Sequence, residues 1–535
     1  MRKLFAVLLL PLTVSANEIS HRTLQSGSPI GPTTLHDRGL RGEGQIIAIL
    51  DTGVDYNNCY FAELDNSPPP FNTGTPAGGL QSSNIDLSRR KIVAYNFLFS
   101  CAQYPGRAGC DTPGNPASLD NQGHGTHSAG AAVGDRAPLL VHDYGDSVAP
   151  GAKLIVQDGG YVGGDLCTQF PGVGCPANLE PILKQAYAQG ARIHSNSWGD
   201  RQGRAGSPPT GNYPRSAHDI DWFVYDNPDM LIIFNTGNLG SNTATPPSSV
   251  SAPGSAKNTL QIGGTRAATT SMNDDIIAEF TLFGPTKDGR IKPDLVAGAR
   301  VVAANADFDN NPNTCDVGLD LGTSWSAPTV AGAAALVRQY YTEGFYPSGK
   351  RNPAQAIQPS AALMKATLIA SARPVLKRRD VTTARTVTAL PVPSPEQGWG
   401  FPVLDDALYF EGDAARTRIV DYSNANGLAQ GESRTIRVEA RPGTPLKAVL
   451  VWTDPPATER AVGDTTPVLV NDLDLNASSD RLNNVEVMTV ANPSGVVDLT
   501  VSARTIGFGT RQGYALVVTG DLVESVATKR RTSRH

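Results

Sequence analysis

Between about residues 45 and 340, short apolar runs alternate with segments of helical periodicity, and this alternation limits the possible folds more than any other feature. Repeated strand, helix, strand units predict a parallel sheet with helices on both faces, an α/β fold. In such sheets functional residues gather at the carboxyl ends of the strands. The predicted strands are residues 46–50, 154–156, 192–195 and 231–234, and the predicted helices include 179–189 and 216–225, the latter with Ser216 as N-cap.

Two more helices are predicted downstream. The segment 326–341 has Pro328 in its first turn, where a missing N–H does no harm. The segment 362–372 is apolar almost all round, which predicts a helix buried in the core. Residues 375–398 are rich in Pro, Thr and Arg, and we expect an exposed loop there.

The character of the chain changes at about residue 413. Strand-like segments follow one another with no helical pattern between them, and several alternate with period two. We therefore expect an all-β sandwich or jelly roll over residues 413–525 and a basic, disordered tail over 526–535. The predicted strands are residues 417–422, 434–440, 446–452, 485–490, 499–503 and 514–518.

The first residues have the layout of a signal peptide, which we assign to residues 1–16. Arg2 and Lys3 precede an apolar run over 4–12, and small residues permit cleavage after Ala16. The run is too short to span a bilayer, and no other stretch is long and apolar enough to do so. A buried N-terminal helix is the alternative interpretation. We expect a secreted protein without a membrane partner, whose catalytic domain covers residues 17–412.

Length and charge limit the number of domains and the kinds of partner that the chain can have. A chain of 535 residues is long enough for two or more domains. Its net charge is −5 at pH 7, and its lysines and arginines form no long run, so we expect no nucleic-acid partner. We expect a monomer whose partners are protein or peptide substrates.

Six cysteines fit an oxidising compartment. Two pairs each flank a short Pro/Gly-rich loop that is easily closed, and this leaves a third pair: Cys101–Cys110, Cys167–Cys175 and Cys59–Cys315. Fifteen connectivities are open to six cysteines, so this is one choice among several. Metal binding is the rival interpretation, although no C-x-x-C spacing supports zinc.

Three short segments place a reactive side chain among small or turn-forming residues. Asp51 lies in LDTGVD, where the chain leaves a predicted strand and turns at Gly53. His124 lies between glycines in GHGTHSAG, and Ser324 lies in GTSWSAP at the start of a predicted helix. Serine is unreactive at its own pKa and needs a base that a third group orients. Taken singly, the segments also fit a turn, a loop and an N-cap, whereas the three together in this order are far more specific.

Together these segments resemble the subtilase family of serine peptidases, whose triad has the chain order Asp, His, Ser. The likeness extends to VAPGAKL (148–154), SNSWG (195–199), NTGN (235–238), SAPGSAKN (251–258) and GRIKPDLVAGA (289–299). Within the family the chain is most similar to the oxidant-stable alkaline subtilases that carry a C-terminal β-barrel. That closer likeness depends on GARIHSNSWG (190–199), QGWGFPVLDDAL (397–408), VLVWTDPP (449–456) and LVNDLDL (469–475).

The resemblance implies catalytic roles at matching positions. Asp51 would orient the imidazole, His124 would act as general base and acid, and Ser324 would attack the peptide carbonyl. Asn238 matches the asparagine whose amide binds the oxyanion, with the Ser324 N–H as second donor and Asn235 as a rival for the assignment. His127 matches a second, non-catalytic histidine of the family. No cofactor is implied for catalysis.

The resemblance also implies where substrate binds. The peptide would lie extended against Ser197, Trp198 and Gly199 and pair as an added strand, which favours broad specificity. Gly237 is a further substrate-binding position, and Ser251 matches the base of the pocket for the side chain before the scissile bond. No carboxylate lies in SVSAPGS (249–255), so we expect apolar or aromatic side chains in that pocket.

One departure from the family concerns oxidation. Trp325 directly follows the proposed nucleophile, where most subtilases have Met. A thioether beside an active serine is a route to inactivation through sulfoxide formation. We therefore expect activity that tolerates peroxide.

A structural calcium ion is a further expectation, because subtilases commonly bind calcium. Hard oxygen ligands are available in the all-β region. The alternative is that these acids lie at strand ends and face water. The four candidate ligands are Asp454, Asp472, Asp474 and Glu486.

Two other functions use the same residues differently. An esterase or lipase would call for a G-x-S-x-G elbow, and GTSWS (322–326) lacks its final glycine. A non-catalytic subtilase acting as a binding module would be marked by loss of a triad residue, and none is missing. The sequence therefore predicts a secreted serine endopeptidase.

Overall fold

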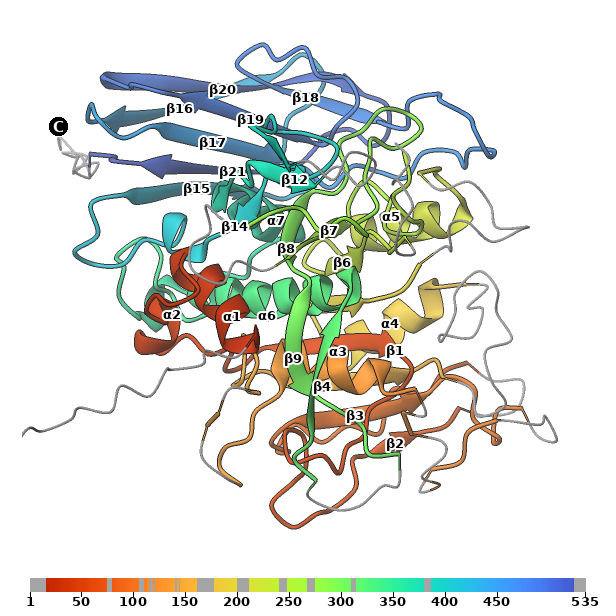
Figure 1. Cartoon of the computed structure of the whole chain (residues 1–535). Coiled ribbons are helices and arrows are strands. Elements are labelled where there is room, and N and C mark those ends of the chain that lie inside the picture. The colour runs from red at the N-terminus through yellow and green to blue at the C-terminus, as the bar shows by residue number, and fades with distance from the viewer. Residues whose placement is uncertain are drawn as a thin grey trace, which may run out of the picture.

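The computed structural model describes residues 16–74, 79–104, 110–113, 115, 119–120, 122–139, 142–143, 145–160, 178–199, 211–239, 248–266, 275–308, 314–379 and 386–523. In Figure 1 the central parallel sheet and its helices form one part of the molecule, and the C-terminal strands lie together at one end of it. Most of the predicted signal peptide and the basic tail lie outside the described residues. Within the described ranges, no helix combines the length and the apolar character that a membrane crossing needs.

The centre of the catalytic region is an eight-stranded sheet in the order β2-β3-β4-β1-β5-β6-β7-β8. Every pair of neighbours is parallel, as the alternation of strands and helices predicts. The order reverses beside β1, which lies between β4 and β5, and crevices at such points bind ligands. The strands are β1 Ile46–Asp51, β2 Phe71–Asn72, β3 Ile92–Phe97, β4 Lys153–Asp158, β5 Ile193–Asn196, β6 Leu231–Asn235, β7 Leu260–Thr265 and β8 Leu295–Gly298.

Helices pack against this sheet, and the longest, α6, contacts β1 and β5 to β8. The α-helices are α1 Ala16–Ser26, α2 Thr34–Asp37, α3 His124–Val133, α4 Glu180–Ala188, α5 Arg215–Asp226, α6 Thr323–Thr342 and α7 Ala361–Ala370. Short 3₁₀ turns lie at η3 Pro353–Gln355, η4 Leu404–Asp406 and η5 Asn424–Asn426. The predicted core helix is confirmed, since every residue of α7 is buried.

Two details of the predicted helices are wrong. Pro214, in extended backbone, precedes the first turn of α5, so Ser216 lies inside the helix and is not its N-cap. Helix α6 begins at Thr323, three residues earlier than predicted, which places Pro328 in the second turn. Pro328 has no N–H to donate to the carbonyl of Ser324, and that carbonyl instead accepts a 2.6 Å hydrogen bond from Ser197 Oγ.

The segment 375–398 is only in part the exposed loop that its composition suggests, since Leu376 and Val392 are exposed and both ends of the segment are buried. Its two ends are joined because the Gln397 side chain accepts from the Val375 N–H at 2.7 Å and donates to the Pro391 carbonyl at 3.0 Å. Gln397 is fully buried. The other short strands before residue 413 are β9 Arg300–Ala304, β10 Val317–Leu321, β11 Ala372–Arg373, β12 Lys377–Arg379, β13 Thr386–Thr388 and β14 Phe401–Pro402.

The region after residue 413 is all-β, as predicted, and consists of two antiparallel sheets in the orders β15-β21-β17-β19 and β16-β20-β18. Leu446, Leu450 and Trp452 belong to the core of this region, whereas Val449 and Val451 join the core of the catalytic region. The four-stranded sheet is therefore buried on both faces, and α7 packs against it. Jelly-roll connectivity stays a prediction. The strands are β15 Arg416–Tyr422, β16 Ser433–Ala440, β17 Leu446–Val451, β18 Asn471–Leu475, β19 Val485–Val490, β20 Gly495–Ile506 and β21 Tyr514–Gly520.

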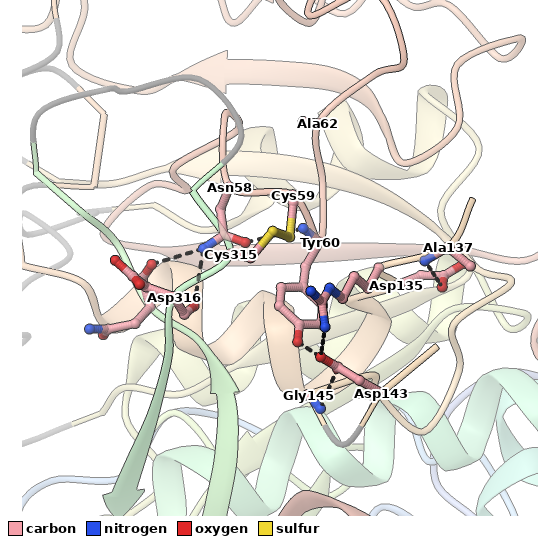
Figure 2. Close-up of a disulfide and its surroundings, with 12 residues drawn as sticks. Asn58, Cys59, Tyr60, Ala62, Asp135, Ala137, Asp143, Gly145, Cys315 and Asp316 are labelled. Carbon is pink, nitrogen blue, oxygen red and sulfur yellow. Dashed lines mark hydrogen bonds and ion pairs between the residues drawn. A yellow bond between two sulfur atoms is a disulfide. The ribbon is translucent and has the colours of Figure 1, made fainter. Parts of the chain in front are cut away.

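Two of the three predicted disulfides are confirmed, Cys59–Cys315 and Cys101–Cys110. Cys167–Cys175 lies outside the described residues. Figure 2 shows the first bond, which joins the chain leaving β1 to the segment entering β10. Beside it the Cys59 N–H donates to the Thr314 carbonyl at 2.7 Å. Because β1 ends at Asp51 and β10 precedes Ser324, this bridge braces the approaches to both residues.

Candidate active site

Asp51 and His124 form the first contact of the site. Asp51 is the last residue of β1, and its Oδ1 lies 2.7 Å from Nδ1 of His124, the first residue of α3. Oδ1 also accepts from the Thr52 N–H at 2.8 Å, and Oδ2 accepts from Ser128 Oγ at 3.0 Å. These donors hold the buried carboxylate in one orientation, and it fixes the imidazole with Nδ1 toward Asp51.

Asp120 holds α3 in place, and it is absent from the sequence-based site. Its Oδ1 accepts from the Gly123 N–H at 2.8 Å and from Thr52 Oγ1 at 2.7 Å, and its Oδ2 accepts from the Thr126 N–H at 2.6 Å. An aspartate just before a helix is a capping signal that could have revealed this role. Burial raises the pKa of Asp120.

The start of α3 approaches the chain after β1 so closely that only glycine fits at residue 125. A Cβ on Gly125 would lie 2.0 Å from the Gly53 carbonyl oxygen, and Gly53 itself has φ +99°. The Gly125 N–H donates to Thr52 Oγ1 at 2.8 Å. The glycines beside the predicted catalytic residues therefore serve helix-to-strand contact, which sets the distance between Asp51 and His124.

Burial of His124 opposes its charged form, but the negative charge of Asp51 and their hydrogen bond outweigh this effect. The net result is a raised pKa for His124. An imidazolium that forms during reaction is thus stabilised where it arises.

Ser324 is the second residue of α6 and is buried. Its Oγ donates to the Ser197 carbonyl at 3.2 Å and accepts from Asn235 Nδ2 at 3.5 Å. The ring centroid of Trp325, the next residue, lies 4.8 Å from that of His124, so the start of α6 packs against the start of α3. Hydrogen bonds within a triad often tighten only when substrate binds.

Two asparagine amides from the end of β6 and the turn after it lie around Ser324. Asn238 is exposed, and its Oδ1 accepts from the N–H and Oγ1 of Thr323, both at 2.9 Å. This fixes the amide plane and leaves Nδ2 as a donor at the start of α6. Asn235 is buried beneath, and its Oδ1 has no partner among the described residues. The geometry therefore makes Asn238 the accessible donor and Asn235 an inner amide that touches the nucleophile.

The predicted substrate-binding residues are brought together beside Ser324. Trp198 is buried and packs edge-on against Phe234 with ring centroids 5.3 Å apart. A Cβ on Gly199 would lie 2.7 Å from Ser251 Oγ, and one on Gly237 would lie 3.5 Å from the same atom. The Cβ positions of both glycines thus face the Ser251 side chain, and these three residues lie side by side.

Trp325 fills the space between the two histidines of the HGTH segment. Its ring centroid lies 4.3 Å from that of His127 in an edge-on contact. Burial lowers the pKa of His127 to about 4. A neutral, buried imidazole packed on an indole fits the structural role predicted for His127.

The four predicted calcium ligands do not form one site, because Asp454 lies in a separate ion pair, and calcium binding stays a prediction. Both Asp454 oxygens are used, since Oδ2 pairs with Lys257 Nζ at 2.5 Å and Oδ1 accepts from the Asn471 N–H at 2.7 Å. Both charged side chains are 0% exposed. A lysine ammonium supplies the positive charge here, and the residues do not fit a metal ion.

The other three candidate ligands surround an arginine. Arg481 Nη1 lies 2.5 Å from Asp474 Oδ1, and its Nε lies 3.5 Å from Asp472 Oδ2. Glu486 Oε2 accepts from the Leu475 N–H at 2.5 Å, and burial raises the pKa of Glu486 to about 7. The guanidinium thus pairs with Asp472 and Asp474 where a cation would otherwise balance their charge.

Within the described residues, one group of three side chains brings metal-ligating atoms within 4.8 Å of one another: Asp135, His142 and Asp146. His142 Nδ1 lies 2.7 Å from Asp146 Oδ2 and 3.3 Å from Asp135 Oδ1. Figure 2 shows Asp135 close to the Cys59–Cys315 disulfide. The arrangement is an ion pair between an exposed imidazole and two carboxylates when the imidazole is protonated.

Comparison with known proteins agrees with the geometry. Residues 42–400 match the subtilase family, peptidase S8. The chain is 26% identical over 560 residues to the serine protease/ABC transporter B family protein tagD of Dictyostelium discoideum, with 83% of this chain and 28% of tagD aligned. It is 25% identical to tagA of the same organism, with 94% of this chain and 32% of tagA aligned. It is also 26% identical to subtilisin BL of Lederbergia lenta, with 57% of this chain and 80% of that protein aligned.

The extent of these alignments differs between the two groups of relatives. The chain spans about a third or less of the length of the two Dictyostelium proteins, 28% of tagD and 32% of tagA. Subtilisin BL is covered almost throughout, and that alignment includes little more than half of this chain. The matched family segment ends at residue 400, before β15 begins at Arg416.

Proposed function

The chain belongs to the subtilase family, and from this we propose that it is a secreted serine endopeptidase that cleaves proteins and peptides with Asp51, His124 and Ser324 as its triad. Family membership supports a serine-type endopeptidase. The single observation that carries the proposal is the 2.7 Å hydrogen bond between Asp51 Oδ1 and His124 Nδ1, and the residue after Ser324, Trp325, packs on His124. This is the arrangement that activates a serine hydroxyl.

In the proposed reaction, Ser324 Oγ attacks the peptide carbonyl carbon while its proton passes to His124 Nε2. The imidazolium then gives that proton to the leaving amine as the C–N bond breaks, which leaves an acyl ester on Ser324. Water attacks this ester, again with His124 as base, and the acid product leaves with Ser324 restored. Asp51 holds the imidazole in the required tautomer throughout and stays ionised.

Charge on the carbonyl oxygen needs donors that are already in place. We assign Asn238 Nδ2 and the backbone N–H of Ser324 to this role. The support is that Thr323 fixes the Asn238 carbonyl end at 2.9 Å, which leaves the amide nitrogen for the oxyanion. Preorganised donors of this kind contribute about 2.7–4 kcal/mol each to the transition state, a magnitude known from subtilisin itself.

We further propose broad specificity with apolar or aromatic side chains before the scissile bond. Main-chain pairing along Ser197, Trp198 and Gly199 is indifferent to substrate side chains. No carboxylate lies in SVSAPGS (249–255), the segment that contains Ser251, so a cationic side chain would find no counter-charge from this segment. We also propose export, on the signal-peptide pattern, and tolerance to peroxide, because a tryptophan replaces the thioether beside the nucleophile.

A digest of a peptide library by the wild type and by Ser324→Ala tests the proposal. We expect the wild type to cut many sequences, mostly after apolar or aromatic residues, and a serine-directed covalent inhibitor to label only the wild type. Cleavage that survives in Ser324→Ala would reject the triad. Strict cleavage after Lys or Arg would reject the pocket assignment and leave the triad standing.

A further inference from the structure

The loop that starts at Ser251, the predicted base of the specificity pocket, ends in contact with the all-β region after residue 413, which we call the β-region. This pocket loop, residues 251–258, starts at Ser251 and ends two residues before β7. Its partner is the clamp segment, residues 454–463, which follows β17 in the β-region. The contact between them is polar, buried and dense in hydrogen bonds, so it fixes the position of both segments.

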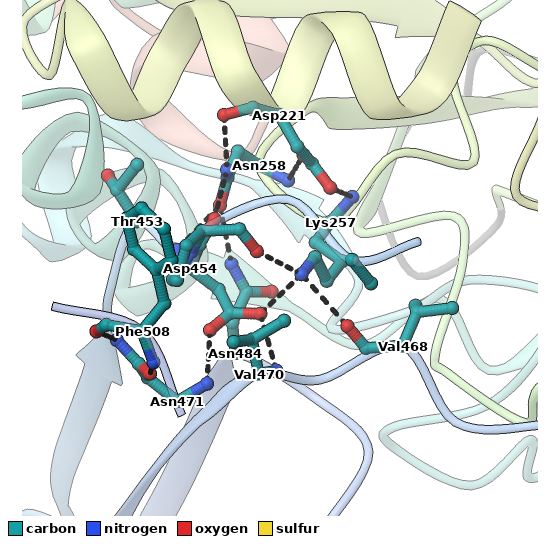
Figure 3. A network of polar contacts seen from close by, with 12 residues as sticks. Asp221, Lys257, Asn258, Thr453, Asp454, Val468, Val470, Asn471, Asn484 and Phe508 are labelled. Carbon is teal, nitrogen blue, oxygen red and sulfur yellow. Dashed lines mark hydrogen bonds and ion pairs between the residues drawn. The ribbon is translucent and has the colours of Figure 1, made fainter. Parts of the chain in front are cut away.

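Lys257 and Asp454 form the centre of this contact. Figure 3 shows the two side chains facing each other between α5 and the β-region. Lys257 Nζ donates to Asp454 Oδ2 and to the Pro455 carbonyl, both at 2.5 Å, and to the Val468 carbonyl at 2.9 Å. All three ammonium donors are thus used by residues of the β-region, and neither side chain is exposed.

Asn258 adds a second connection at the same end of the loop. Its Nδ2 donates to the Asp454 carbonyl at 2.8 Å, and its Oδ1 accepts from the Asp454 N–H at 2.9 Å. Asn484 Nδ2 donates to the same oxygen at 3.1 Å. On the other side, Asp221 of α5 accepts from the N–H groups of Lys257 and Asn258 at 3.2 and 2.9 Å. The end of the pocket loop is therefore held between α5 and the β-region.

The beginning of the pocket loop is reached by a separate chain of contacts. The Gly463 N–H donates to Asn212 Oδ1 at 3.0 Å, and the Arg460 N–H donates to the Tyr213 carbonyl at 2.9 Å. One residue earlier, the Gly211 N–H donates to the carbonyl of Val250 at 2.7 Å. Val250 directly precedes Ser251, so the clamp segment restrains both ends of the loop.

We propose that the β-region positions the specificity pocket, with Asp454 as a positioning residue that acts through Lys257 and Asn258. This inference rests on the proposed endopeptidase function. Asp454 lies outside the pocket and touches neither substrate nor Ser324; its effect is to hold the loop whose first residue forms the pocket base. The proposal concerns the cleavage of peptides whose side chain before the scissile bond fills this pocket.

The test uses the full chain and three peptides. Two differ only in the residue before the scissile bond, phenylalanine or alanine, and the third differs from the first only after that bond. The variants are Asn258→Ala, which keeps the ion pair, and the double variant Lys257→Met with Asp454→Met, which removes both charges together. Arg481→Met is the matched control, because it removes a β-region ion pair that does not touch the pocket loop.

We expect both test variants to change the ratio of kcat/KM for the phenylalanine peptide to that for the alanine peptide by about fivefold or more, mainly through a change in KM. The ratio for the two peptides that differ only after the scissile bond should stay unchanged. Arg481→Met should keep the wild-type ratio. A ratio within about twofold of wild type in folded test variants, or equal slowing on all three peptides, would overturn the proposal. If the double variant does not fold, Asn258→Ala decides. A wild type that cleaves none of the peptides removes the proposed function itself.

Discussion

Asp51, at the end of β1, and Asp454, just after β17, are two buried carboxylates, and each has a cationic or protonatable partner. The two pairs differ in whether the partner keeps a hydrogen-bonding atom free. Asp51 meets His124, whose side chain is 31% exposed, and the pair leaves Nε2 for the proton exchange that we propose with Ser324. Asp454 meets Lys257, and both side chains are 0% exposed. Every ammonium donor of Lys257 has an acceptor in the β-region. The first pair retains an unused proton site at the surface, and the second retains none.

The difference shows what separates a reactive carboxylate from a structural one in this fold. Burial and an opposite charge are common to both, so neither identifies a catalytic group. What differs is the partner's remaining hydrogen-bonding capacity and its access to solvent. Substitutions on the two sides should therefore fail in different ways, through the rate of reaction at Asp51 and through stability and pocket selectivity at Asp454.

The largest expected effect comes from Asp51→Asn. An amide cannot hold the required imidazole tautomer, so kcat should fall by about 10⁴-fold with little change in thermal unfolding. The active form needs neutral His124, so activity falls as pH drops through the pKa of His124. Loss of the Asp51 charge lowers this raised pKa, and the acid limb of kcat/KM should move to lower pH. Steady-state kinetics across pH measure both effects.

Ser128→Ala is the matched control, because it removes a 3.0 Å donor to Asp51 Oδ2 and keeps the carboxylate. Its kcat should fall far less than that of Asp51→Asn. A residual acid limb at the same pH in Asp51→Asn and wild type would contradict the assignment of that limb to His124.

On the structural side, Asp454→Ala should destabilise the protein by about 3–5 kcal/mol, because Lys257 is left buried without its counter-charge. The double variant Lys257→Met with Asp454→Met should recover most of that loss, since no charge is then buried. Urea unfolding followed by fluorescence compares the three proteins. Equal loss in the single and double variants would mean that packing, and not charge, holds this contact.

The two sites also differ in how far the sequence could predict them. Asp51, His124 and Ser324 each lie in a short motif with its own glycines, so local sequence marks each of them even though Asp51 and His124 lie 73 residues apart. Lys257 lies 197 residues from Asp454, and an aspartate after a strand has no local feature that distinguishes a lysine partner from a calcium ion. The sequence therefore predicted Asp454 as a calcium ligand and could not predict its pairing with Lys257.

In the fold too, local patterns could be predicted from the sequence and long-range contacts could not. Strand and helix alternation predicts the parallel sheet because each element carries its own periodicity. The buried ends of segment 375–398 depend on Gln397, whose contacts with Val375 and Pro391 cannot be read from a Pro-rich composition. β18 was missed because its residues, NDLDL, are acidic and polar, and pairing with β20 overrides their low strand propensity.

The asparagines beside Ser324 sharpen the catalytic half of the comparison. Asn238→Ala should lower kcat by about 10²–10³-fold with KM nearly unchanged, because its amide acts in the transition state. Asn235→Ala removes a 3.5 Å contact to Ser324 Oγ and should cost about tenfold or less. Single-turnover acylation rates measure both. The reverse ranking would make Asn235 the main oxyanion donor.

Trp325→Met tests the oxidant tolerance that we propose for the wild type. The thioether would lie beside His124, where the indole ring now lies 4.8 Å away, and peroxide would convert it to a polar sulfoxide next to the nucleophile. We expect the wild type to keep its activity in dilute peroxide and the variant to lose about nine-tenths of it, with recovery by a sulfoxide reductase. Equal losses in both proteins would trace the inactivation to another residue.

The smallest expected effect is at Arg481, the partly exposed counterpart of Lys257 in the β-region. Its side chain is 34% exposed, against 0% for Lys257, so water screens its pairs with Asp472 and Asp474. Arg481→Met should therefore change the free energy of unfolding by about 1 kcal/mol or less. Because the guanidinium occupies the space between these acids, its removal could open a cation site that the wild type lacks. A calcium titration monitored by thermal unfolding separates the two cases. Calcium that stabilises Arg481→Met more than wild type would show that the arginine substitutes for the ion. Equal shifts would show that these acids bind no calcium even without the guanidinium between them.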